Sequence, residues 1–79
     1  MNETELKKII LQSLKKVAPD TNPEILQAGD KIREKLDMDS FDALRFIVEL
    51  NEKTGVDIPE EDYWKIVTLK DLMHYIMKK

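Results

Sequence analysis

The residues of this chain that are best suited to binding or reaction chemistry lie in one short segment, LDMDSFDALRF, at positions 36–46. The segment places the hydroxyl of Ser40 between the carboxylates of Asp39 and Asp42. Such a cluster can cap a helix, bind a cation or present a nucleophile, and each role needs different surroundings. The helical spacing that follows favours Asp39 as the N-cap and Ser40 as the first helical residue. The Ser40 hydroxyl is then expected at the positive end of the helix dipole, where a phosphate group is favourably placed.

A calcium site of the EF-hand type fits this segment only at its start. Asp37 and Asp39 match the first two ligand positions of such a loop. Phe41 then stands at the third ligand position, and Asp42 stands where the sharp turn requires glycine. The sequence therefore predicts no metal site.

A catalytic serine also lacks its partners here. It would need a base within hydrogen-bond reach and an oxyanion site. The single histidine, His74, lies in the predicted final helix, and no glycine elbow surrounds Ser40. We therefore predict that the protein is not an enzyme and that any chemistry at Ser40 is performed by another protein.

The elements around this segment are predicted to be helices. A first helix is indicated by apolar residues at helical spacing, with Asn2 or Thr4 as its cap and Pro19 and Pro23 ending it. The apolar positions of this helix are Leu6, Ile9, Ile10, Leu14 and Val17. A second helix is predicted from Ser40 to Lys53, where Thr54-Gly55 stops it.

The connection over residues 18–39 is long for a compact domain, so it is expected to carry function or a short helix of its own. Its anchors onto the core are predicted to be Ile25, Leu26, Ile32 and Leu36. After the second helix, Pro59 is placed as the first residue of a short acidic helix. The final helix opens at Thr68, with Asp71 at capping-box spacing.

The fold class that follows is all-α: a small four-helix bundle of three main helices and one short helix, with a long loop between the first two. The buried face of the final helix is expected at Leu69, Leu72, Met73 and Ile76. Tyr63, Trp64 and Tyr75 are expected in the core rather than at a ligand site. The whole chain, residues 1–79, is predicted to be a single domain.

The second helix carries more apolar surface than a bundle needs. One stripe, Ala43, Phe46, Ile47 and Leu50, is typical of core. A second stripe, Phe41, Leu44 and Val48, widens the apolar arc to roughly 220°, whereas a surface helix needs little over 100°. The second stripe is either covered by the long loop or reserved for a partner protein.

Composition sets the remaining bounds. The chain has no cysteine, which excludes disulfides and thiolate chemistry of its own, and its net charge is −3. Residues 1–17 carry +2, residues 18–62 carry −8 and residues 63–79 carry +3. We expect the acidic middle to attract cationic partners and to repel nucleic acid. No apolar run reaches the roughly 20 residues of a membrane span, so a cytoplasmic location is predicted. Separately, we expect the protein to be a monomer.

Taken together, the segments LDMDSFDALRFIVELNEKTGVDIPEED and TLKDLMHYI resemble an acyl carrier protein, or more broadly a phosphopantetheine-binding carrier domain. The likeness covers essentially the whole chain. It implies that 4′-phosphopantetheine is attached to Ser40 by a phosphopantetheinyl transferase and holds acyl groups as thioesters, as in fatty acid biosynthesis. It also implies that Phe41, Leu44 and Val48 contact acyl-transferring or ligating enzymes. The acids flanking this stripe, Asp39, Asp42, Glu49 and Glu52, would meet basic docking patches on those enzymes.

The chain departs from the family pattern at several positions. Phe41 replaces the usual leucine, Asp37 stands where glycine is frequent, and Trp64 stands where smaller or charged residues are usual. Arg45 reverses a charge beside the docking stripe, which favours a specialised lipid or secondary-metabolite pathway. Two alternatives stay open: an aminoacyl or peptidyl carrier, and a helical interaction module in which Ser40 is only a cap.

Overall fold

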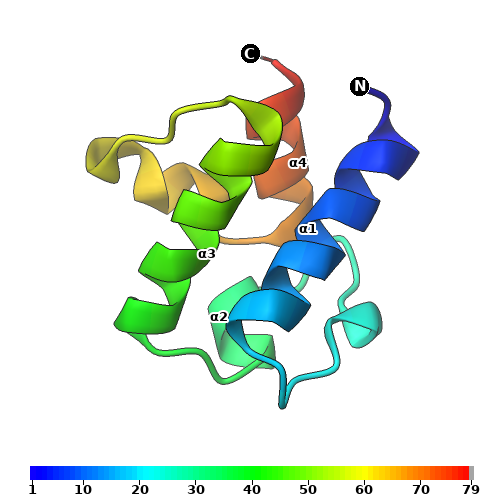
Figure 1. Ribbon diagram of the computed structural model, residues 1–79, viewed down its shortest axis with the longest axis vertical. Coiled ribbons are helices and arrows are strands. Elements are labelled where there is room, and N and C mark those ends of the chain that lie inside the picture. Colours follow the sequence, from blue (N-terminus) through cyan, green and yellow to red (C-terminus); the bar gives the residue numbers. More distant parts are fainter. Residues whose placement is uncertain (79) are drawn as a thin grey trace.

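The computed structural model describes residues 1–78 and is helical throughout its regular elements (Figure 1). The α-helices are α1 (Glu3–Val17), α2 (Ile32–Lys35), α3 (Ser40–Thr54) and α4 (Leu69–Met77). Two 3-10 helices, η1 (Pro23–Ile25) and η2 (Glu60–Ile66), complete the order α1, η1, α2, α3, η2, α4. This confirms the all-α prediction.

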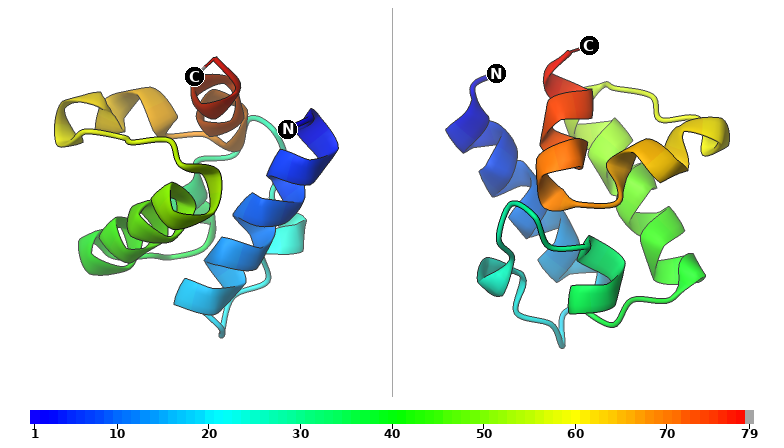
Figure 2. Two further views of the ribbon diagram at one scale, coloured as in Figure 1. Left: turned by 45° about the horizontal axis from the view of Figure 1, so that its top comes forward. Right: turned by 180° about the vertical axis from the view of Figure 1, so that it is seen from behind.

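The long helices form a bundle in which α1 runs antiparallel to α3 and α4 (Figure 1). Both termini lie at one end, and α3 begins at the opposite end, beside α2 (Figure 1). The other views show α3 and η2 on one side of the molecule, α1 on the opposite side and α4 between them (Figure 2). The start of α3 is therefore separated from the chain ends by the length of the bundle.

One apolar core holds these elements together. Leu6, Ile10 and Leu14 of α1 are fully buried, as are Leu50 of α3 and Leu72 of α4. These side chains recur at the helical spacing that the sequence predicted. Ile9 and Met73, which were predicted in the same stripes, are only partly buried and pack against the edge of the core.

The helix ends follow local capping chemistry. Asn2, rather than Thr4, caps α1 by accepting from the Glu5 amide at 2.8 Å. Thr68 caps α4 by accepting from the Asp71 amide at 3.1 Å, as predicted. α3 runs one residue beyond the prediction, to Thr54, and ends at Gly55, whose φ of 73° is a left-handed conformation that glycine adopts without strain.

Two predictions about the connections need correction. Ile25 is 48% exposed and does not anchor the long connection, whereas Leu26, Ile32 and Leu36 are buried as predicted. The acidic helix after Ile58 is a 3-10 helix, and Pro59 is its N-cap rather than its first residue. The connection contains a short helix of its own, α2, which was one of the two expectations for a connection of this length.

Trp64 is the clearest error in the predicted core. Its side chain is 72% exposed on η2, and its ring lies 5.5 Å from the Lys65 ammonium. Tyr75 is buried as predicted, and Tyr63 packs partly buried against the core. A 3-10 helix turns every three residues, so the face that η2 buries differs from the α-helical face that the sequence pattern suggested.

Candidate functional site

Ser40 is the first residue of α3 and is exposed. Asp39 precedes it in an extended conformation and accepts a hydrogen bond from the Asp42 amide at 2.8 Å. This is the N-cap geometry that the sequence predicted. The first amides of a helix have no carbonyl partners within it, so Ser40 lies where the helix favours a negative charge.

A tight turn after α2 delivers the chain to this position. The Met38 amide donates to the Arg33 carbonyl at 2.9 Å, and the Asp37 amide donates to the Glu34 carbonyl at 3.4 Å. This pair of bonds is the Schellman pattern, which needs a left-handed residue after the helix cap. Asp37 takes that conformation, with φ of 52°. The glycine-like position noted in the sequence is therefore a genuine left-handed site occupied by aspartate.

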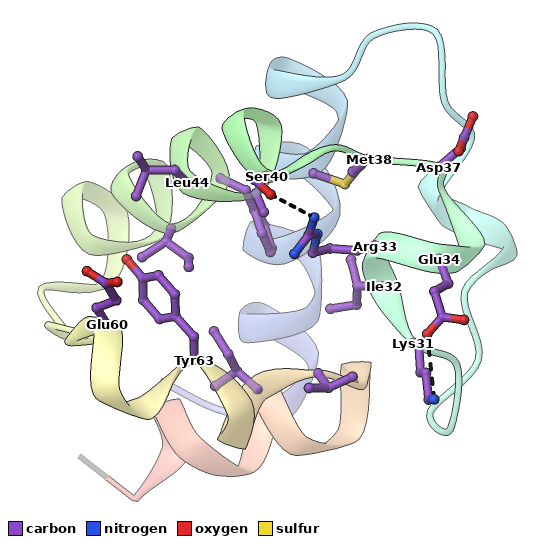
Figure 3. Close-up of a pocket in the computed structure, with 15 residues that line it drawn as sticks. Lys31, Ile32, Arg33, Glu34, Asp37, Met38, Ser40, Leu44, Glu60 and Tyr63 are labelled. Carbon is purple, nitrogen blue, oxygen red and sulfur yellow. Dashed lines mark hydrogen bonds and ion pairs between the residues drawn. The ribbon is translucent and has the colours of Figure 1, made fainter.

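Arg33 joins α2 to the start of α3. Its Nη2 donates a hydrogen bond of 3.2 Å to Ser40 Oγ (Figure 3). Both side chains are exposed, and Arg33 forms no ion pair within residues 1–78. Sequence reasoning missed this contact because the two residues lie on different elements, and only the turn at Asp37 brings them together.

A groove opens beside Ser40, between α2, α3 and η2 (Figure 3). Its volume is about 720 Å³, and Ser40 and Arg33 lie among its lining residues. The apolar part of its lining includes Ile32, Met38, Ile47, Tyr63, Ile66 and Val67. An apolar groove of this size can take a flexible acyl chain or another slender apolar group.

The second stripe of α3 is exposed rather than covered by the long connection. Phe41, Leu44 and Val48 are 67%, 48% and 52% exposed, while Phe46 and Leu50 on the other stripe are buried. The structure thus leaves an apolar strip, Phe41, Leu44 and Val48, on the outside of α3. Throughout, this set is called the α3 strip.

The charged residues around the α3 strip are not equally available. Asp39 and Glu52 are exposed. Glu49 is largely covered, and its carboxylate is paired with Lys16 at 3.1 Å and Lys53 at 3.9 Å. Asp42 lies 3.8 Å from Arg45, whose guanidinium also lies 6.0 Å from the centre of the Phe41 ring. The positive charge of Arg45 is thus offset locally by Asp42.

The surroundings of the Ser40 hydroxyl determine whether a base or a metal ion could act on it. The hydrogen-bond partner of Ser40 Oγ within the described chain is a guanidinium, which cannot act as a base. Residues 1–78 contain no group of three acidic or histidine side chains that could hold a metal ion. No helix in the same range is long and apolar enough to cross a membrane.

Comparison with known proteins agrees with this geometry. A family model described as a phosphopantetheine attachment site matches residues 5–76. The chain belongs to this family of phosphopantetheine-binding carriers. Among similar proteins, the acyl carrier protein of Wolinella succinogenes is 32% identical over 72 residues, covering 91% of this chain and 88% of the relative. That of Thermosynechococcus vestitus is 33% identical over 82 aligned residues, covering 100% and 96% of the two chains.

The residues of this carrier fit the prosthetic group that the family name implies. A phosphodiester on an exposed helix N-terminal hydroxyl would meet free amides and the Arg33 guanidinium. When attached, phosphopantetheine supplies a terminal thiol, which a chain without cysteine cannot supply itself. Members of the family are carriers rather than catalysts, and they work with a phosphopantetheinyl transferase and with enzymes that handle the tethered group.

Proposed function

We propose that Ser40 is the attachment point of the 4′-phosphopantetheine arm and that the chain carries acyl groups on it as thioesters. The observation that carries this proposal is an exposed hydroxyl at the start of α3 whose hydrogen-bond partner within residues 1–78 is a cation at 3.2 Å. A hydroxyl in that setting is a poor nucleophile for its own chemistry and a favourable place for a phosphate. The acyl cargo is inferred from the relatives, which are named acyl carrier proteins.

Intact-mass measurement tests the attachment. The chain is incubated with coenzyme A, magnesium and a broad-specificity phosphopantetheinyl transferase, and it should gain the mass of one phosphopantetheine group. Ser40→Ala should abolish the gain. The chain has one other serine, the buried Ser13, so Ser13→Ala is a matched control that should still be modified. A chain that stays unmodified by several active transferases would favour the interaction-module alternative.

The groove between α2, α3 and η2 is the proposed resting place of the acyl chain. Ser40 lies at the groove, and its apolar lining would remove an alkyl chain from water, which stabilises by about 0.8 kcal/mol per buried CH₂. Ala43 is half-buried in the lining, so Ala43→Leu should narrow the groove. Thioesters of long acyl chains should then hydrolyse faster than in the wild-type carrier, while acetyl thioesters should be unaffected. Equal protection of both chain lengths would argue against the groove.

The α3 strip is the proposed docking surface for partner enzymes, with Asp39, Asp42 and Glu49 as flanking acids and Arg45 as a specificity residue. Exposed ion pairs contribute only about 0–1 kcal/mol each, but they steer encounter and fix orientation. Because Arg45 reverses one charge at this surface, we assign the carrier to a specialised pathway rather than to general fatty acid synthesis. An aminoacyl carrier is the second candidate, and loading assays with acyl and aminoacyl ligases distinguish the two.

Substitution of the α3 strip tests docking. Leu44→Asp should leave the unfolding free energy within about 0.5 kcal/mol of wild type, because Leu44 is exposed. It should lower kcat/KM for modification about tenfold or more by placing a charge in an apolar contact. Ile25→Asp is the matched control, since Ile25 is also 48% exposed but lies on η1. If both variants lose activity equally, the strip is not the docking surface.

The remaining parts of the proposal concern the molecule as a whole. We propose that residues 1–79 act as one carrier domain, as a monomer, in the cytoplasm and without catalytic activity of their own. A monomer suits a shuttle that must present the same strip to successive partners, because a stable dimer through the strip would cover it. Size-exclusion chromatography with light scattering measures the oligomeric state directly.

A further inference from the structure

Arg33 stands apart from the other basic side chains near Ser40. Lys31, on the same segment, is paired with Glu34 at 3.5 Å, and Arg45 is paired with Asp42 at 3.8 Å. Arg33 has no carboxylate partner within residues 1–78 and instead donates to the hydroxyl of Ser40. A hydroxyl is a weak partner for a guanidinium, which pairs most strongly with carboxylate or phosphate oxygens.

The backbone fixes this arrangement before any group is attached. The Arg33 carbonyl accepts a hydrogen bond from the Met38 amide, and this bond closes the turn that leads into α3. Ile32, Leu36 and Met38 are each at most 6% exposed, so the segment bearing Arg33 is anchored on both sides. The backbone that bears the guanidinium is therefore already restrained, so pairing would order only the exposed Arg33 side chain.

Arg33 already contacts Ser40 Oγ, and a phosphodiester would place phosphorus one bond beyond that atom and its two non-bridging oxygens, which share one negative charge, one bond further. The guanidinium can then exchange its bond to a neutral hydroxyl for charge-assisted bonds to phosphate, with a fork geometry that suits two oxygens. Arg33 also lines the groove, so the pairing would hold the phosphate on the groove side of α3.

We propose that Arg33 pairs with the phosphate of the prosthetic arm and restrains the base of that arm. This inference rests on the proposed attachment at Ser40. Arg33 is a positioning residue in this scheme, because it acts on the arm's phosphate and not on the thiol that carries the cargo.

The test uses the full chain in its modified and unmodified forms. Arg33→Gln is compared with Lys35→Gln, which removes a positive charge from the same short helix at a side chain that neither lines the groove nor contacts Ser40. Arg33→Lys is included because lysine keeps the positive charge but lacks the paired N–H donors with which a guanidinium can bind two phosphate oxygens. The readouts are the 31P chemical shift of the attached phosphate and the change in the unfolding equilibrium constant that attachment causes in each variant. Measuring that change within each variant cancels any effect of the substitution on folding itself.

In the wild type and in Lys35→Gln, attachment should lower the unfolding equilibrium constant about fivefold more than in Arg33→Gln, as suits a solvent-exposed, charge-assisted pair. The 31P shift should move in Arg33→Gln, move part of the way in Arg33→Lys and stay in place in Lys35→Gln. The proposal is overturned if Arg33→Gln and Lys35→Gln match the wild type in both readouts. Failure of the attachment itself would appear earlier and separately, as a chain that gains no mass.

Discussion

Asp37 is the residue whose backbone conformation is least expected for its type. It has φ of 52° at the position after the α2 cap, where glycine or asparagine is usual. The left-handed region costs most L-residues roughly 1–2 kcal/mol, and aspartate is among the few that tolerate it. This residue lies in the turn that sets the direction in which the chain enters α3 at Ser40.

We therefore predict that Asp37→Gly raises the free energy of unfolding by about 0.5–1 kcal/mol, because glycine removes the β-carbon strain at positive φ. Asp37→Ala should lower it by a similar amount, because alanine has the β-carbon but no polar group to support the turn. Urea unfolding of the unmodified chain measures both. Equal shifts in the two variants would show that the lost carboxylate, and not the backbone conformation, determines the stability.

Ser13 in α1 is expected to lower stability for a different reason, the burial of its hydroxyl. It is fully buried, and its Oγ has no hydrogen-bond partner within the described chain. A buried polar group without a partner loses its hydration and gains nothing in return. Ser13→Ala should therefore raise the free energy of unfolding by about 1 kcal/mol. Ser40→Ala is the control, since it makes the same change at an exposed helical position and should alter stability by less than about 0.5 kcal/mol. A loss of stability in Ser13→Ala would mean that the hydroxyl is satisfied by water.

At the scale of elements, a short hydrogen bond links η2 to α4 in addition to the packing between them. Tyr75 Oη donates to a carboxylate oxygen of Asp62 at 2.6 Å. This bond, assisted by burial and by the charge of Asp62, raises the pKa of Tyr75 to about 12. Because η2 forms one wall of the groove, the bond also positions Tyr63 and Ile66 in the lining.

The raised pKa predicts how stability changes at high pH. The unfolded chain releases the tyrosine proton near pH 10, whereas the folded chain keeps it until about pH 12. Over this window the unfolded state binds fewer protons, so rising pH favours unfolding. The stability that Tyr75 contributes should be fully present below pH 10 and lost by about pH 12. In Tyr75→Phe this loss should be absent, so the difference in unfolding free energy between the two chains should shrink from pH 8 to pH 11. A constant difference would contradict the assignment.

What the sequence could predict at this scale was local. The caps Asp39 and Thr68 and the end of α3 at Gly55 follow from chemistry within four residues, and all three are correct. Ile25 and Trp64 were placed in the core on their apolar character alone, and both are exposed. Their burial depends on how η1 and η2 pack, which no local pattern records. The contact between Arg33 and Ser40 was missed for the same reason, because it spans a turn whose conformation is set by Asp37.

At the scale of the whole molecule, the segment that contains Ser40 differs in net charge from the segments before and after it. Residues 18–62 carry −8; they include all of α2 and α3 and the first three residues of η2, and they supply Ser40 and most of the groove lining. α1 lies on the opposite side from η2, with α4 between them (Figure 2), and the segments that contain α1 and α4, residues 1–17 and 63–79, are net positive. The acidic residues are thus concentrated in the middle of the sequence, which contains Ser40, and net positive charge lies in the segments on either side of it. A basic enzyme surface would be attracted to the side where the arm is proposed to be attached.

This distribution of charge predicts that high salt slows recognition of the carrier by the transferase without lowering the free energy of unfolding. Raising ionic strength from about 0.05 M to about 0.5 M shortens the screening length from roughly 14 Å to roughly 4 Å, so long-range steering is lost. The kcat/KM for modification by the transferase should then fall about fivefold or more, mainly through KM, because encounter and not the chemical step is affected. Glu52→Gln, which removes an exposed charge beside the α3 strip, should reduce the salt dependence, whereas Glu24→Gln on η1 should not. Urea unfolding at both salt concentrations separates steering from stability. A rate that is independent of salt, in a carrier that is equally stable at both concentrations, would leave the apolar strip as the main determinant of docking.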